Sequence, residues 1–302
     1  MADWYYKYSG AWKLVNQAFF KDSSTWKEIQ EAYYKDGGVW KNFYTAFVAT
    51  SFTTETSNTT VTVPSGANAI HVRQAVGGGS SGVNGGTYDK SGGESAGSGG
   101  GSGGYVSDKI FTVAEGETLT LTVGAGGSGN TGSNPNFAGV DGGNTVLSGS
   151  STGSIFTLAG STAGYATGGS TSPNVGPLRT NFPSVGGTTT INGTEITSGS
   201  FRESNGASVT IATATTLAGG PVGTFDQSGD GVAGVNGANC TPDDCTIVGG
   251  DGGDSYDGNI SGGSANSGAG GEGAGGGGGG HPFSPGGAGG DGKIVYRFLR
   301  IN

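Results

Sequence analysis

The chain has 302 residues, of which 68 are glycine, so glycine is about three times as frequent as in an average protein. Hydrophobic residues make up 32% and charged residues 12%, which leaves too few apolar side chains for an ordinary oily core. Glycine disfavours helix interiors by about 1 kcal/mol relative to alanine, so a largely helical fold is excluded. The net charge of −9 would repel a phosphate backbone, which argues against nucleic acid as a partner.

The first 50 residues differ in composition from the rest of the chain. They contain all four tryptophans, whereas only four glycines precede residue 77. This shift predicts a small aromatic module, residues 1–50, followed by a glycine-rich β domain, residues 51–302. Within the second domain, a Ser/Thr-rich stretch at about 150–250 is expected to be an insertion.

The aromatic module repeats every 14 residues. Residues 19–27 (FFKDSSTWK) align with residues 33–41 (YYKDGGVWK), and residues 5–13 (YYKYSGAWK) precede them in register. Asp-Ser-Ser and Asp-Gly-Gly are turn signals, and aromatic or β-branched residues suited to strands flank them. The repeats therefore predict a β-meander. Its strands are expected near residues 11–20, 25–35 and 39–48.

Two questions about this module stay open at the level of sequence. Residues 27–34 contain good helix formers, but strand is favoured because the repeat is too short to hold a helical hairpin. The aromatic side chains either form a stacking platform for carbohydrates or bases, or form the core of a module that is short of aliphatic residues. Packing in a core is the favoured role. A docking or oligomerisation role would fall on Trp12, Trp26 and Trp40.

Beyond residue 50, short strand patterns alternate with glycine-rich tracts. Their number and spacing predict a β-sandwich-like, all-β domain without a long helix. The predicted strands are residues 60–64, 69–76, 109–113, 118–123, 154–158, 208–212 and 293–301.

The glycine tracts allow two interpretations. One is a flexible linker. The other rests on a three-residue glycine period near residues 97–104 and 262–292, because an extended helix with three residues per turn would then have a face without side chains. Such polyglycine II helices can pack backbone against backbone and exchange hydrogen bonds. Ordered glycine tracts are the favoured prediction.

Residue patterns of an enzyme or a metal site are lacking. His71 lies inside a predicted strand and His281 inside a glycine tract, and neither has a motif partner, so we expect no catalytic residues, no cofactor and no metal. Aspartates at positions 251, 254 and 257 are expected to be solvated turn residues. Cys240 and Cys245 are five residues apart and are candidates for a disulfide in an oxidising setting.

The framing strands resemble a known family. Residues 60–66 (TVTVPSG), 116–127 (GETLTLTVGAGG) and 292–296 (GKIVY) look like the glycine-rich domain of phage tail fibres and related surface proteins. The Trp-Lys repeats also resemble tandem repeats in tail-fibre proteins of marine phages. The resemblance implies that the first and last strands belong to one β framework, and that loops between the glycine tracts contact the host.

From this resemblance we expect a non-enzymatic virion protein, a tail fibre or tail-tip adhesin that binds a host glycan or outer-membrane protein. The alternative is a baseplate or capsid decoration protein without receptor contact. The aromatic module would bind other tail proteins, and a trimer is the favoured homo-oligomer. Lone aromatics in the glycine-rich domain are the candidate receptor contacts, although each ring alternatively anchors its loop. They are Tyr88, Tyr105, Tyr165, Tyr256 and Phe283.

Localisation is expected to be the virion, after synthesis in the host cytoplasm. The N-terminus has no basic-then-apolar leader, which predicts that no signal peptide directs export. No apolar run approaches the roughly 18 residues of a membrane-spanning helix, so membrane insertion is not expected.

Overall fold

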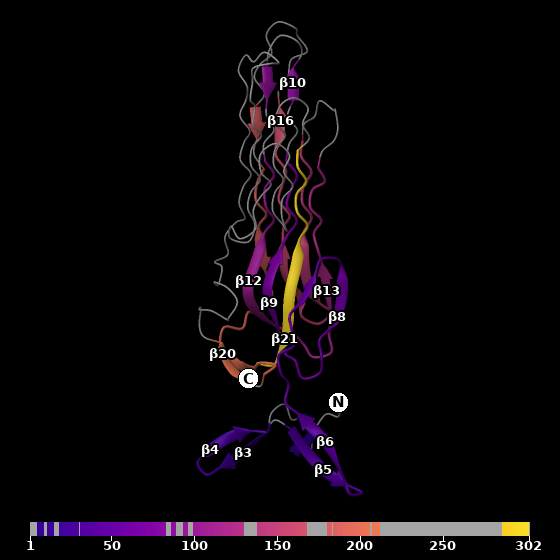
Figure 1. The fold of residues 1–302 in the computed structure, drawn as a ribbon, viewed down its shortest axis with the longest axis vertical. Coiled ribbons are helices and arrows are strands. Elements are labelled where there is room, and N and C mark those ends of the chain that lie inside the picture. Colours follow the sequence, from indigo (N-terminus) through magenta and orange to yellow (C-terminus); the bar gives the residue numbers. More distant parts are fainter. Residues whose placement is uncertain are drawn as a thin grey trace.

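The computed structural model describes residues 5–8, 11–14, 18–29, 31–82, 86–88, 93–95, 99–129, 138–167, 180–182, 184–205, 207–211 and 286–301. Throughout these ranges the regular elements are β-strands, which confirms the all-β fold class. In the same ranges, no helix is long and apolar enough to cross a membrane. The molecule is elongated, with short hairpins at one end, two sheets in the middle and extended tracts at the other end (Figure 1).

The strands are β1 (Tyr5–Tyr8), β2 (Ala11–Leu14), β3 (Phe19–Asp22), β4 (Thr25–Glu28), β5 (Glu31–Asp36), β6 (Val39–Thr45), β7 (Thr53–Glu55), β8 (Thr59–Thr62), β9 (Ala69–Val76), β10 (Gly86–Tyr88), β11 (Gly93–Ser95), β12 (Tyr105–Thr112), β13 (Thr118–Thr122), β14 (Thr145–Gly149), β15 (Gly153–Leu158), β16 (Tyr165–Thr167), β17 (Thr180–Phe182), β18 (Thr189–Ile191), β19 (Gly199–Arg202), β20 (Ser208–Ile211) and β21 (Lys293–Leu299).

Each N-terminal repeat folds as a hairpin of its own. β1 pairs with β2, β3 with β4 and β5 with β6, all antiparallel. The predicted turns are confirmed: Gly37 and Gly38 both have positive φ, as a tight two-residue hairpin turn requires. The continuous strand expected near 25–35 is instead divided between β4 and β5. Each repeat closes its ladder within itself, and in the described part of the module no strand pairs with a strand of another repeat.

Two antiparallel sheets form the sandwich. The first has the order β12-β9-β21-β7 and the second the order β18-β15-β14-β13-β8. Alternate residues of both sheets point inward and pack a compact apolar core, in which the rings of Phe111 and Phe156 lie 6.1 Å apart. All seven strands predicted beyond residue 50 are present. The sequence patterns missed β14 and β19, whose apolar residues are sparse, and the three-residue strands.

The C-terminal strand β21 lies in the middle of the first sheet, between β9 and β7. Ile294 pairs with Ala75 on one side and Glu55 on the other. The TVTVPSG strand β8 lies in the second sheet, so the first and last strands of the resemblance belong to the two facing sheets of one sandwich. β15 and β18 of the second sheet come from the Ser/Thr-rich stretch, so that this part of the stretch is integral to the sandwich.

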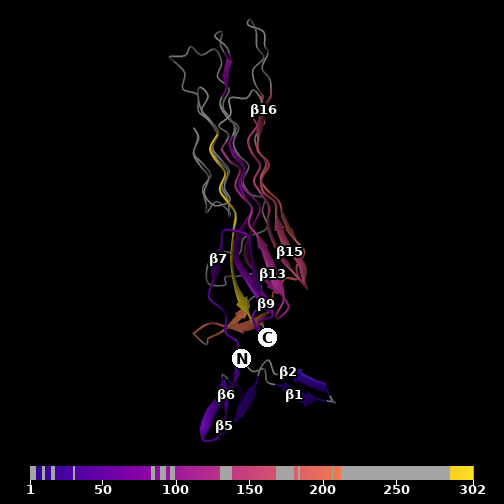
Figure 2. The same ribbon diagram turned by 90° about the vertical axis from the view of Figure 1, so that its right-hand side faces the viewer.

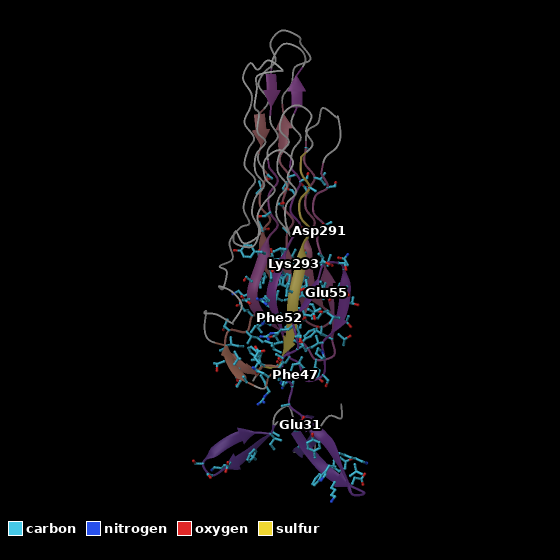
Figure 3. All side chains as sticks on the ribbon, viewed as in Figure 1. Glu31, Phe47, Phe52, Glu55, Asp291 and Lys293 are labelled. Atoms are coloured by element: carbon cyan, nitrogen blue, oxygen red, sulfur yellow. The ribbon has the colours of Figure 1, made fainter. Side chains whose placement is uncertain are left out.

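The linker from the hairpins to the sandwich packs along the body. Phe47 contacts the core at the end of the sandwich that faces the hairpins (Figure 3). Gly66 at the adjacent turn has φ +86°, and a Cβ there would lie 3.2 Å from the Phe47 ring. The Ala49 and Thr50 N–H groups donate to Arg202 O and Phe298 O at 2.7 and 3.1 Å. The linker, residues 46–50, is thus fixed to the body.

Glu117, from the GETLTLTVGAGG motif, is a structural carboxylate. Its side chain is buried and accepts hydrogen bonds from the N–H groups of Ala114, Ser151 and Thr152 and from the Thr152 hydroxyl. Burial by itself would raise the pKa of Glu117, but these donors outweigh it and hold the pKa below its ordinary value near 4.5. The carboxylate thus ties two loops together in its ionised form.

We expect Glu117→Gln to lower the free energy of unfolding by about 1–3 kcal/mol at neutral pH, because an amide N–H would face backbone donors. The folded-state pKa is depressed, so the stabilisation is present above the unfolded value and is lost as the pH falls through the folded one. Thermal unfolding from pH 6 down to pH 2 measures this. The gap between wild type and variant should shrink with acid, and a constant gap would contradict the assignment.

Candidate functional site

The glycine-rich tracts continue the strands of the sandwich as a bundle. Figures 1 and 2 show them running side by side, away from the N-terminal hairpins. The described tracts are residues 77–82, 99–104, 124–129, 138–143, 159–164, 184–188 and 286–292.

Backbone hydrogen bonds hold this bundle together with a period of three residues. Along tract 77–82, the first and fourth N–H groups donate to tract 99–104, the second and fifth to tract 138–143, and the third and sixth to tract 286–292. The N···O distances lie between 2.8 and 3.0 Å. Tracts 124–129 and 159–164 donate back to it. Three residues per turn and bonds between chains identify a polyglycine II bundle with tract 77–82 at its centre.

The prediction that the glycine tracts are ordered is confirmed for residues 99–104 and 286–292. Residues 97–98 and 262–285 lie outside the described ranges. Backbone contact explains the composition. A Cβ on Gly78 would lie 2.2 Å from Ala125 O, and one on Gly142 would lie 2.0 Å from Gly78 O. Those distances are impossible for real carbon atoms, so only glycine fits.

Serine, aspartate and asparagine side chains add hydrogen bonds at positions of the bundle that have room for a side chain. The Ser161 hydroxyl is buried, accepts from Ser80 N–H at 2.6 Å and donates to Gly101 O at 2.5 Å. On the outer tracts, carboxylate and amide oxygens accept from N–H groups of a neighbouring tract. These bonds are Asp141 to Ala163 at 2.7 Å, Asn144 to Gly160 at 3.0 Å and Asp291 to Gly126 at 2.7 Å. The bundle is therefore bonded across its surface as well as through its centre.

The predicted receptor contacts divide into three groups. Tyr88 in β10 and Tyr165 in β16 are carried along the bundle, far from the N-terminal hairpins (Figure 1). Tyr105 is 3% exposed at the base of the bundle, where its backbone exchanges hydrogen bonds with the Thr189 hydroxyl. Its ring is closed to a receptor, and that prediction is wrong. Tyr256 and Phe283 lie outside the described ranges, as do Cys240 and Cys245.

The aromatic side chains described in the N-terminal hairpins are exposed to a large extent. Trp40 is 65% exposed and Tyr33 and Tyr34 are each 48% exposed, and Phe20 is similarly open. The favoured prediction of an aromatic core is therefore wrong for these four residues, since a two-stranded hairpin has no second layer to cover either face. Trp12 and Trp26 occupy the equivalent places in β2 and β4, but their side chains are not described.

The three hairpins share one cross-strand pattern. Lysine faces tryptophan in each, as Lys7 opposite Trp12, Lys21 opposite Trp26 and Lys35 opposite Trp40. In the third hairpin the Lys35 ammonium lies 5.9 Å from the centroid of the Trp40 ring. The backbone register of lysine against tryptophan is therefore the same in all three hairpins.

A buried group of ionisable side chains covers the outer face of the first sheet. His71 Nε2 lies 3.3 Å from Asp108 Oδ1, and the Arg297 Nε–H donates to His71 Nδ1 at 3.2 Å. The Arg297 guanidinium also donates to both Glu203 oxygens, at 2.8 and 2.9 Å. It stacks on the rings of Phe52 and Phe201, at 4.5 and 5.2 Å from their centroids. We refer to these four ionisable residues as the His71 network.

The sequence did not indicate the His71 network. His71 and Arg297 are 226 positions apart, and they meet because β9 and β21 place them directly opposite each other. The one available signal was an ionisable residue inside each of two largely apolar strands, namely His71 in β9 and Asp108 in β12. Asp108 has φ +46°, which is uncommon for a residue other than glycine. Both ring nitrogens of His71 are engaged, so the ring serves packing rather than proton transfer to a substrate.

Comparison with known families agrees with this architecture. The model of a family described as a glycine-rich domain matches residues 53–299. The chain belongs to this glycine-rich domain family. The match begins at β7 and ends at β21, so the glycine-rich domain comprises the sandwich and the bundle and begins after the hairpins. No curated protein matches the chain.

Proposed function

We propose that the chain is a non-enzymatic phage virion protein, a tail fibre or tail-tip adhesin that binds a host glycan or outer-membrane protein. The supporting observation is the separation of two features along the long axis. Exposed aromatic hairpins lie at one end, and a polyglycine bundle runs from the sandwich toward the other (Figure 1). The hairpins would attach the chain to other tail proteins, and the far part of the bundle would carry the receptor contacts. Three such chains would form the fibre.

The chemistry of the bundle supports this division. Its amide groups are bonded to neighbouring tracts, and its exposed positions include small side chains such as Ala125 and Ser128 and the valines at 140 and 185. The described tracts contain no aromatic side chain, so we assign specific contact to the aromatic residues carried beyond them. Tyrosine supplies a large rigid area at low cost in conformational entropy, which makes Tyr88 and Tyr165 the candidate contacts.

The test is binding of the labelled full-length chain to host cells. Tyr88→Ala and Tyr165→Ala together should weaken cell binding at least tenfold, because aromatic contacts at the centre of an interface contribute about 2 kcal/mol or more each. Trp40→Ala is the matched control: it should leave cell binding unchanged and reduce incorporation into virions. Unchanged binding by the double tyrosine variant would refute these contacts.

A second outcome separates the adhesin from its alternative. If the wild-type chain binds no host cell and imaging of virions places it in the baseplate or on the capsid, the chain is a structural protein without receptor contact. The adhesin is supported if imaging places the wild-type chain at the tail periphery and if the chain binds host cells but the double tyrosine variant does not.

A further inference from the structure

We propose that Asp108, His71, Arg297 and Glu203 form an acid-sensitive latch, which holds the β19–β20 hairpin and the linker 46–50 against the sandwich and opens when His71 takes a second proton. The inference is independent of the receptor and of the identity of the virion. It rests on what the two ring nitrogens of His71, the Arg297 guanidinium and the Glu203 carboxylate bond to. Asp108 Oδ2 is buried without a hydrogen-bond partner among the described residues.

The tautomer of His71 follows from its two partners. Arg297 can only donate, so Nδ1 must be the unprotonated nitrogen that accepts from the Arg297 Nε–H. Nε2 then carries the proton and donates it to Asp108 Oδ1. The neutral ring satisfies both contacts, and its side chain is 2% exposed, so water cannot substitute for either.

A second proton on the His71 ring can add to only one nitrogen. It would add to Nδ1, where the new N–H would face the Arg297 Nε–H, so that two hydrogen-bond donors oppose each other. The resulting imidazolium would also place a positive charge beside the guanidinium. Asp108 would favour the imidazolium, but it lies at Nε2, whose proton is already in place. Burial lowers the pKa of His71 below 6.5, and the Arg297 charge acts in the same direction against the opposing influence of Asp108 and Glu203. The closed network thus requires the neutral ring.

The groups packed around the ring come from four elements. Asp108 is on β12, Arg297 on β21 and Glu203 directly after β19, while Arg73 on β9 lies over the Phe52 ring at 5.4 Å from its centroid. Phe52 itself contacts the imidazole edge-on, with 5.2 Å between ring centroids. The donor that faces Nδ1 is the Arg297 Nε–H.

The β19–β20 hairpin depends on Arg297. Glu203 receives both guanidinium bonds, and Phe201 packs with Ile211 and Leu299 in a second, smaller apolar cluster on the outer face of the sheet. The linker residue Ala49 belongs to the same cluster and donates to Arg202 O. If Arg297 turns away from a protonated ring, Glu203 loses its partner. The hairpin and the linker that leads to the N-terminal repeats then loosen together.

The sign of the pH dependence follows from linkage. The open state has an ordinary histidine pKa near 6.5 and the closed state a lower one, so the closed latch is fully stable above pH 6.5 and weakens as the pH falls. At pH 5.5, one unit below the open-state value, the opening equilibrium should rise by up to about tenfold.

Hydrogen exchange on the full-length chain at pH 7.5 and pH 5.5, corrected for intrinsic rates, tests the latch. Amides of residues 199–205, 207–211 and 46–50 should lose protection at pH 5.5, by up to about tenfold, whereas those of β13 and β14 should not. His71→Asn is the matched variant, because its side-chain oxygen can accept from Arg297 but does not titrate; it should abolish the pH response. Unchanged protection in wild type, or the same response in His71→Asn, overturns the proposal.

Nitrogen NMR of the wild-type imidazole decides the case even if His71→Asn does not fold. The chain has two histidines, and His281→Gln identifies the signal of His71. A neutral ring protonated at Nε2, with a pKa below 6.5, is expected. The Nδ1–H tautomer, or a pKa above 6.5, would refute the latch.

Discussion

Gly127→Ala is expected to lower the free energy of unfolding by about 3 kcal/mol, and its neighbour Ser128→Ala by less than about 0.5 kcal/mol. A Cβ on Gly127 would lie 2.0 Å from Val140 O and 2.6 Å from Ser81 N. Both are backbone atoms that are hydrogen bonded to each other at 2.9 Å, so neither can move aside without breaking the bundle. Ser128 points outward and is exposed.

Thermal unfolding of the two variants measures this difference. Three kcal/mol corresponds to a fall of roughly 6–12 °C in Tm for a domain of about this size. Both substitutions end in alanine, one position apart. Gly127→Ala also restricts the unfolded chain, which by itself would stabilise the fold, so a loss of stability reports the clash. Equal effects would mean that the tracts do not pack backbone to backbone.

Arg297→Met is expected to lower the free energy of unfolding by about 3–5 kcal/mol, the cost of breaking a buried charge pair. The substitution removes both bonds to Glu203 and the bond to His71, while methionine retains much of the apolar contact with Phe52 and Phe201. Glu203 is then left partly buried without its cation.

Arg73→Met serves as the control, since Arg73 is exposed and its guanidinium contacts the same Phe52 ring at 5.4 Å. It should cost less than about 1 kcal/mol. Denaturant unfolding measures the free energy of unfolding of both single variants and of a double variant that carries Arg297→Met and Glu203→Leu. The combination should recover part of the loss, because the uncompensated carboxylate is gone. An Arg297→Met effect no larger than that of Arg73→Met would show that the network contributes little to stability.

Local patterns predicted much of the fold. Alternation of threonine with leucine or valine located β8 and β13, and the Asp-Gly-Gly turn located the β5–β6 hairpin. The three-residue glycine period predicted helices with three residues per turn. Each of these signals acts over a few residues, where side-chain direction and backbone freedom are fixed by the local sequence.

The site residues were harder to predict. Tyr105 looks like any lone aromatic in a glycine-rich stretch, yet it begins β12 and is buried, whereas Tyr88 and Tyr165 lie farther along the bundle. Exposure depends on which tract passes over a residue. For the N-terminal aromatics, the repeat predicted the hairpin turns, but it did not predict that no second layer covers the hairpins.

Composition and short periods constrain each segment separately, and they were enough to predict an all-β, glycine-rich chain with an aromatic repeat module. The neighbours of each tract follow from the tertiary structure, since backbone amides are alike in every tract and do not specify which tract pairs with which. The tertiary structure also decided that β21 enters the sheet beside β9, which brings Arg297 to His71 and Glu203. Contacts between residues more than 200 positions apart depend on the closure of the whole sandwich, and no local pattern encodes it.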